Sequence, residues 1–167
     1  LEVEQGILGD LATVGALDVT AEEQMWGRVE DADAIMVYHT LKLTRATIER
    51  LQRCKLIVRC GVGYDNVDHA FARSRGIPVA NVPDYGTEEV ADSAIGMLLA
   101  LTRGITRQNT RLRPADADWR FHHIAPLYRL RERTLAILGL GRIGSAVAAR
   151  GKALGINVMF YDPYKPD

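Results

Sequence analysis

The chain has 167 residues, of which 47% are hydrophobic and 25% are charged, which is the composition of a soluble globular protein of one or two small domains. Its 21 basic and 21 acidic residues give a formal net charge of +0, so composition indicates no nucleic-acid-binding surface. Apolar runs all fall short of the roughly 18 residues that suggest a membrane span, and the two cysteines, Cys54 and Cys60, form no metal-binding pattern.

The first third of the chain alternates between helical and extended patterns. Apolar spacing predicts a helix over residues 2–11, and residues 15–19 resemble a short strand. Thr20 and Glu23 have the spacing of a capping box that opens a helix to about residue 30. The continuous apolar run 34–38 predicts a strand buried on both faces, followed by a helix over 44–52.

The same alternation continues to residue 106. Residues 56–60 are predicted to form a strand, 67–75 a helix that stops at Gly76, and 77–80 a strand that Pro78 places at a sheet edge or a strand start. A long helix is expected over 87–106, with Glu88 and Glu89 in its first turn. This order predicts a doubly wound parallel sheet, and because such a unit opens with a strand, it predicts truncation before residue 1.

The strongest motif follows an irregular, arginine-rich excursion over residues 107–132. An apolar run at 135–138 leads into a glycine-rich turn and a helical pattern, and a second apolar run at 158–161 ends on Asp162. This is the dinucleotide-binding fingerprint, with the acid at roughly the expected distance of about 20 residues. The predicted cofactor-binding residues of the turn are Gly139, Leu140, Gly141, Arg142, Ile143 and Gly144.

Each feature of this fingerprint has a physical role. Gly139 allows the tight turn, Gly141 lets the backbone approach a pyrophosphate, and Gly144 lets the helix pack against the strand. The helix N-terminus offers N–H groups and a positive dipole end to the phosphates. Asp162 can accept both ribose hydroxyls and would repel a 2′-phosphate, so NAD is favoured over NADP. The alternative is a plain turn without a ligand.

Two loops at predicted strand ends are candidates for substrate contact. Gly61, Val62 and Gly63 follow one strand, and a glycine loop in that position can cradle an anion with its backbone N–H groups. His39 follows the neighbouring strand. The alternatives are a simple turn at residues 61–63 and a histidine without a function at 39.

Six segments together resemble the D-2-hydroxyacid dehydrogenase family, most closely its C-terminal-binding-protein branch. They are residues 38–44, 57–68, 76–83, 88–93, 139–144 and 161–164, with Tyr-His-Thr, Gly-Val-Gly-Tyr-Asp-Asn-Val-Asp and Tyr-Asp-Pro-Tyr among them. The resemblance extends from about residue 34 to the end of the chain.

The resemblance implies a flavodoxin-like substrate domain over residues 1–106, including an interdomain helix at about 88–106, and the first part of a Rossmann domain over 107–167. The fold is then α/β, with two doubly wound parallel-sheet units and truncation at both ends. The 61–63 loop would bind the substrate carboxylate, and His39 matches the active-site histidine of the branch. Val90 stands where many relatives have a threonine that contacts the nicotinamide side of the cofactor.

The implied protein is an NAD-dependent oxidoreductase that acts on a small 2-hydroxy or 2-keto acid. A cytoplasmic homodimer, formed through the cofactor-binding domain, is expected, with no membrane, nucleic-acid or metal partner. The family's catalytic arginine, acid and histidine lie beyond residue 167, so we predict no catalytic residue here and no turnover by this portion alone. The alternative is an NAD-responsive scaffold, similar to a corepressor, without significant turnover.

Overall fold

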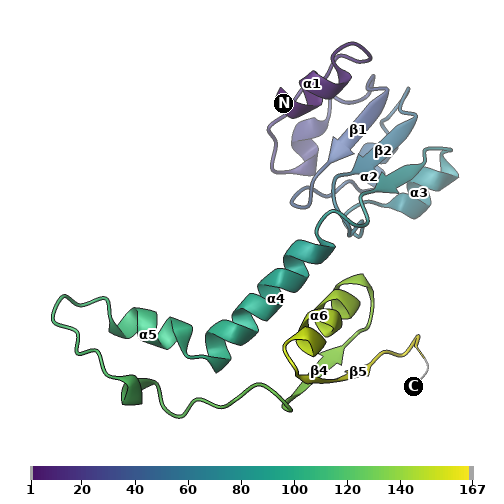
Figure 1. The fold of residues 1–167 in the computed structure, drawn as a ribbon. Helices are drawn as coiled ribbons and strands as arrows, with labels where there is room; N and C mark the ends of the chain where they lie inside the picture. Colours follow the sequence, from purple (N-terminus) through teal and green to yellow (C-terminus); the bar gives the residue numbers. More distant parts are fainter. Residues whose placement is uncertain (1, 166–167) are drawn as a thin grey trace. The chain divides into compact units, whose positions relative to one another are not determined.

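A computed structural model describes residues 2–165, which fall into two compact units that meet between Tyr85 and Gly86 (Figure 1). Both are α/β units with parallel sheets, which confirms that part of the predicted fold class. The division falls before the long helix, whereas the sequence suggested a boundary after residue 106. The long helix packs within the second unit, so the structural units differ from the predicted domains there.

The first unit is built on a three-stranded parallel sheet of order β1-β2-β3. The strands are β1 (Ala34–Val37), β2 (Leu56–Arg59) and β3 (Val79–Asn81). Ile57 of β2 lies opposite Ile35 of β1 and Val79 of β3. Pro78 directly precedes β3, which is an edge strand of this sheet among the described residues, in agreement with the prediction of a sheet edge or a strand start. Parallel pairing places the carboxyl ends of all three strands at one edge of the sheet.

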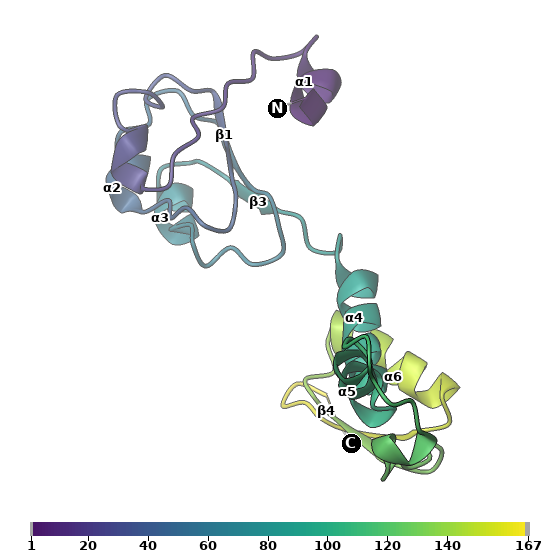
Figure 2. The same cartoon turned by 90° about the vertical axis from the view of Figure 1, so that its left-hand side faces the viewer.

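Short helices cover one face of this sheet (Figure 2). They are α2 (Arg45–Ile48), whose N-cap is Thr44, and α3 (His69–Ser74), whose N-cap Asp68 accepts the N–H of Phe71 at 3.0 Å. The buried side chains between helices and sheet form the core: Met25, Val29, Ile35, Val37, Leu43, Ile48, Leu51, Cys54, Ile57, Val67, Ala72 and Ile77. Gly76 ends the α3 segment with φ +76°, as predicted.

Several local predictions for the first unit need correction. The predicted strand 15–19 is irregular, and the predicted helix from Thr20 is one 3-10 turn, η1 (Glu22–Met25). Gln24, not Glu23, caps it by accepting the N–H groups of Thr20 and Ala21. The helix predicted over residues 2–11 is confirmed as α1 (Glu2–Leu8), which ends three residues earlier than predicted.

Strand β1 is buried on one face only. Ile35 and Val37 are 7% and 2% exposed, whereas Met36 is 43% exposed. The prediction of burial on both faces is therefore wrong, because within residues 2–165 the helices α2 and α3 cover only the face that Ile35 and Val37 share.

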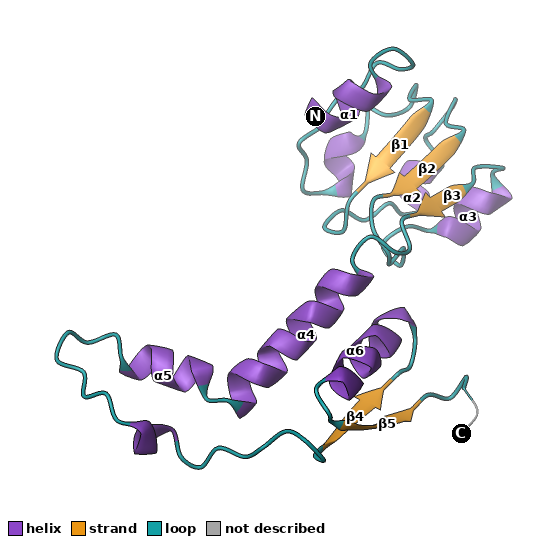
Figure 3. Cartoon of the chain, in the orientation of Figure 1, coloured by secondary structure: helices purple, strands orange, loops and turns teal. Residues whose placement is uncertain are grey.

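The second unit consists of a helical part and a β-α-β part (Figure 3). The helices are α4 (Thr87–Thr102), α5 (Ile105–Arg111) and the 3-10 turn η2 (Phe121–Ile124). The predicted single helix to residue 106 is broken at Gly104, which has φ +66°. Strands β4 (Thr134–Leu138) and β5 (Asn157–Tyr161) pair in parallel and are joined by α6 (Arg142–Ala153).

Arginines at the end of α4 and along α5 hold the irregular segment that returns to β4. Arg103 donates to the carbonyl of Tyr128 at 3.0 Å, and Arg107 donates to that of Ile124. Arg111 lies 3.4 Å from a ring nitrogen of His123. These three arginines therefore contact the chain itself. Within residues 2–165, none of the helices has the length and apolarity needed to cross a membrane.

Candidate functional site

The glycine-rich turn between β4 and α6 has the geometry that its sequence predicts. Gly139 has φ +90°, a conformation that side-chain-bearing residues rarely adopt. A Cβ atom on Gly144 would overlap the carbonyl oxygen of Gly139, so only glycine lets α6 start this close to the end of β4. Further along α6, a Cβ atom on Gly151 would come close to the side chains of Leu135 and Val158, at 3.1 and 3.4 Å.

Gly141 differs from these glycines because a Cβ atom there would meet no heavy atom within 4 Å. Its φ of −75° is also accessible to any residue, so neither packing nor backbone geometry of the turn requires glycine. Gly141 is the N-cap of α6 and supplies no side-chain cap to the helix N-terminus. Open space at a helix N-terminus fits a pyrophosphate that approaches the backbone.

Asp162, just after β5, folds back onto the turn. One carboxylate oxygen accepts the N–H of Leu140 at 2.6 Å, and the other accepts the N–H of Tyr164 at 2.8 Å. A carboxylate offers about four acceptor positions, so two neighbouring hydroxyls can still be bound. The structure thus brings the predicted acid and the predicted glycine turn together.

The other predicted cofactor residues lie in the same unit. Arg142 and Ile143 form the first turn of α6, and the Ile143 side chain is 41% exposed. Val90 lies in the first half of α4 and is 48% exposed. Helices α4 and α6 pack together along their lengths.

Arg150 of α6 joins these two helices through a pair of carboxylates. Its guanidinium lies 2.6 Å from a carboxylate oxygen of Glu88 and 2.6 Å from one of Asp92, both on α4. The hydrogen bonds to Glu88 and Asp92 are the main reason why the pKa of Arg150 is raised. These two ion pairs hold the start of α4, which carries Val90, against α6.

The predicted substrate residues lie at the carboxyl ends of β1 and β2. Gly61, Val62 and Gly63 follow β2, and His39 follows β1. His39, Val62 and Gly63 are exposed, whereas Gly61 is buried. The N–H of Cys60 donates to the carbonyl of Val37 at 2.9 Å, so the two strands stay paired up to these loops.

Three polar side chains around these loops were missed by the sequence reasoning. The guanidinium of Arg59 occupies the place of a Cβ atom on Gly61, so a side chain there would displace it. Asn81 donates its side-chain amide to the carbonyl of Val62 at 2.8 Å. Asn66 donates to the carbonyls of Tyr38 and Leu41 at 2.9 and 2.7 Å. All three lie inside the segments 57–68 and 76–83 that the sequence singled out, but their contacts depend on tertiary structure.

Cys60 directly precedes the glycine loop, but its thiol is held in the protonated form. Burial raises its pKa, and this outweighs the hydrogen bond from Tyr38, which lowers it. A protonated thiol is a poor nucleophile, so the raised pKa disfavours a nucleophilic role for Cys60.

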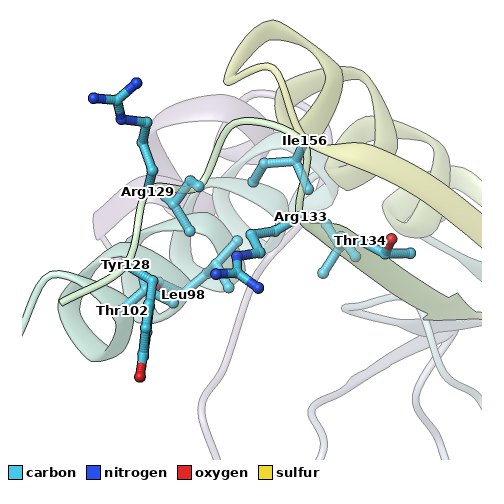
Figure 4. Close-up of a pocket in the computed structure, with 9 residues that line it drawn as sticks. Leu98, Thr102, Tyr128, Arg129, Arg133, Thr134 and Ile156 are labelled. Carbon is cyan, nitrogen blue, oxygen red and sulfur yellow. The ribbon is translucent and has the colours of Figure 1, made fainter. Parts of the chain in front are cut away.

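A cavity of about 330 Å³ lies elsewhere in the second unit, between α4 and the segment that returns to β4 (Figure 4). Leu98 and Thr102 line it from α4, Tyr128 and Arg133 from the returning segment, and Leu135 from β4. Arg129 points away from it. The cavity is at the amino end of β4, whereas ligands of open parallel sheets bind at the carboxyl ends. It is therefore separate from the glycine turn.

A family model described as "D-isomer specific 2-hydroxyacid dehydrogenase, catalytic domain" matches residues 2–159. The chain belongs to this family. A D-3-phosphoglycerate dehydrogenase of Methanocaldococcus jannaschii is 38% identical over 93% of the chain. C-terminal-binding protein 1 of Caenorhabditis elegans is 34% identical over 97% of it. Because the first of these is the more similar, the comparisons do not single out the C-terminal-binding-protein branch.

Two solved structures show the same fold. D-lactate dehydrogenase from Aquifex aeolicus, complexed with NAD and lactic acid, matches with a TM-score of 0.80 and 31% identity over 100% of the chain. The TT0316 protein from Thermus thermophilus matches with a TM-score of 0.87 and 28% identity over 98% of the chain. The chain covers 49% and 54% of these structures, and 30% and 23% of the two curated relatives.

Proposed function

We propose that the chain is part of an NAD-dependent oxidoreductase that transfers hydride between nicotinamide and a small 2-hydroxy or 2-keto acid. The observation that carries the proposal is the contact between Asp162 and Leu140, which joins an acid after β5 to a glycine turn with open space at Gly141. A relative with 31% identity was solved with NAD and lactic acid.

In this proposal the second unit is the opening part of a Rossmann domain that binds NAD. Gly139 and Gly144 shape the turn, and the backbone at Gly141 faces the pyrophosphate. Asp162 accepts the ribose hydroxyls, and its negative charge disfavours NADP. Leu140, Arg142 and Ile143 surround the helix N-terminus, and Val90 offers an apolar side chain toward the nicotinamide half. When bound, the cofactor supplies or accepts the hydride.

The first unit is proposed as a flavodoxin-like substrate domain. The sequence-based candidates were Gly61, Val62 and Gly63, but the N–H of Gly61 donates to the carbonyl of Arg59 at 2.8 Å. The backbone N–H groups of Val62 and Gly63 would therefore bind the substrate carboxylate, and His39 would contact the same small acid. Arg59, whose guanidinium lies over Gly61, adds positive charge that favours an anionic substrate. The family's arginine, which clamps the carbonyl, its acid and its proton-donating histidine are not among the candidate residues of this chain, so we propose that residues 1–167 alone do not turn over.

A second copy of the chain is the proposed partner, bound through the cofactor-binding unit. The α4–α5 region exposes large apolar side chains: Met97 is 68% exposed, Leu101 is 81% exposed and Ile105 is 56% exposed. A dimer formed through this region would bury the side chains of Met97, Leu101 and Ile105. Light scattering on the full-length protein tests this, and Leu101→Glu should shift a dimer toward the monomer.

The second candidate function is an NAD-responsive scaffold. It is favoured by the 34% identity to a C-terminal-binding protein over 97% of the chain and by the Tyr-His-Thr segment that contains His39. Such a protein would bind NAD through the same turn but would not need efficient turnover.

The experiment that tests the proposal uses the full-length protein. NADH oxidation is followed with glyoxylate, pyruvate and hydroxypyruvate, and NAD binding is measured by calorimetry. Turnover of one of these acids is the expected result. Binding of NAD without turnover of any of them would favour the scaffold. Failure to bind NAD would contradict both functions.

A further inference from the structure

The loop that carries His39 is held by a side chain that follows the other substrate loop in the chain. Asn66 lies after the 61–63 loop, and its carboxamide nitrogen reaches two carbonyl oxygens, those of Tyr38 at 2.9 Å and Leu41 at 2.7 Å. These two residues flank His39 on either side. One carboxamide therefore spans the segment in which the histidine lies.

The backbone of Asn66 is itself fixed to the core of the first unit. Its carbonyl accepts the N–H of Leu43 at 2.8 Å, and the N–H of Asp68 returns a bond to the carbonyl of Leu43 at 2.9 Å. Leu43 and Val67, which pair here in a parallel bridge, are 0% and 2% exposed. The side chain of Asn66 thus extends from a rigid anchor toward a loop that is exposed at His39.

The acceptor side of the same carboxamide faces the glycine loop. Its oxygen lies 3.4 Å from Nε of Arg59, whose guanidinium occupies the space above Gly61. Asn66 therefore contacts the His39 loop with its nitrogen and the Gly61 neighbour with its oxygen. No other residue type of this size offers two N–H donors and a neutral acceptor together.

We propose that Asn66 is the positioning residue of the substrate site: it sets the position of His39 relative to the glycine loop without touching substrate itself. This inference rests on the proposed function, because it assumes that His39 contacts the substrate. Small displacements of such groups cost much activity, since a site must be held within about 0.5 Å of its productive geometry.

The test compares Asn66→Asp with the unmutated full-length protein. Aspartate has the same shape but places an anionic oxygen against the two carbonyl oxygens, so the His39 loop should be released while the Arg59 contact persists. We expect KM for the 2-keto acid to rise at least tenfold, with the Kd for NAD changed less than twofold. Asn157→Asp is the matched control, because its amide also donates to one backbone carbonyl, that of Glu132 at 3.1 Å, in the other unit.

Two further measurements keep the proposal falsifiable. Asn66→Ser removes both donors without adding charge, and it replaces Asn66→Asp if that variant does not fold. The ring signals of His39 in NMR spectra report its surroundings without turnover. The chemical shifts of these signals should change in the Asn66 variants and should remain unchanged in Asn157→Asp.

The outcomes separate this inference from the proposed function. If the unmutated protein turns over and both KM and the His39 signals are unchanged in the Asn66 variants, the positioning role is overturned. If the unmutated protein does not turn over, the proposed function fails, and the His39 signals alone then decide whether Asn66 positions the histidine.

Discussion

The carboxylate of Asp162 accepts the backbone N–H of Leu140 at 2.6 Å, which ties the end of β5 to the turn after β4. Two residues 22 positions apart in the chain thereby become one structural feature. The contact places the carboxylate beside the turn that precedes α6, where the predicted cofactor residues 139–144 lie. Loss of this carboxylate should therefore affect both cofactor affinity and cofactor choice.

Asp162→Ala should weaken NAD binding roughly tenfold to a hundredfold, because hydrogen bonds to a charged group contribute about 1.5–3 kcal/mol. NADP binding should weaken less, since repulsion of the 2′-phosphate is also lost. Calorimetry with both cofactors measures this. Asp33→Ala, which removes an exposed carboxylate in the first unit, is the control and should change neither affinity. Equal affinity of the unmutated protein for NADP would refute the assignment.

Gly141 and Gly144 should respond in opposite ways to an added side chain. Gly141→Val meets open space and should leave the melting temperature nearly unchanged while cofactor binding is lost. Gly144→Val forces the Gly139 carbonyl away and should destabilise the fold by on the order of 1–3 kcal/mol. Urea unfolding and calorimetry together distinguish the two effects. NAD affinity that survives in Gly141→Val would show that the turn has only a structural role.

Arg150→Met should loosen α4 from α6, because it removes the ion pairs with Glu88 and Asp92 while keeping much of the apolar stem. We expect a lower melting temperature, with a smaller difference from the unmutated protein at high salt, where exposed ion pairs are screened. Arg53→Met, which breaks the exposed pair with Asp33, is the control and should have the smaller effect. If the variant is as stable as the unmutated protein at low salt, the ion pairs of Arg150 do not hold α4 against α6.

Glu22 should make the stability of the first unit depend on pH. Burial opposes its ionisation, but hydrogen bonds from Thr47 and from the backbone and hydroxyl of Thr44 outweigh this and hold the pKa of Glu22 below 4.5. A lowered folded-state pKa contributes stability that is present above pH 4.5 and is lost as the pH falls through the folded value.

The test for this site is Glu22→Gln, which keeps one acceptor oxygen and removes the charge. The difference in urea midpoint between this variant and the unmutated protein should be largest at neutral pH and should shrink below pH 4.5. Glu23→Gln, on the neighbouring residue, is the control. A difference that stays constant from neutral to strongly acidic pH would show that the charge of Glu22 is not involved.

Local sequence rules determined most of the elements and the glycine turn. Gly139 and Gly144 were predicted because a tight turn and a close helix both exclude side chains, and these are effects of near neighbours in the chain. Asp162 was predicted from its distance to the same motif. Gly76 and Pro78 marked the end of a helix and the start of a strand for similarly local reasons.

Only the tertiary structure decided which groups meet across the chain. The apolar run at β1 gave no sign that Met36 would be exposed, since burial depends on what covers each face of the sheet. The sequence predicted Glu23 as the capping residue of η1, but Gln24 has this role in the structure, where the segment forms a single 3-10 turn and not a longer helix. Asn66 appeared in sequence only as part of a motif. Its contacts with Tyr38 and Leu41 exist because parallel strands bring loops distant in the chain to one sheet edge, and that pairing is non-local.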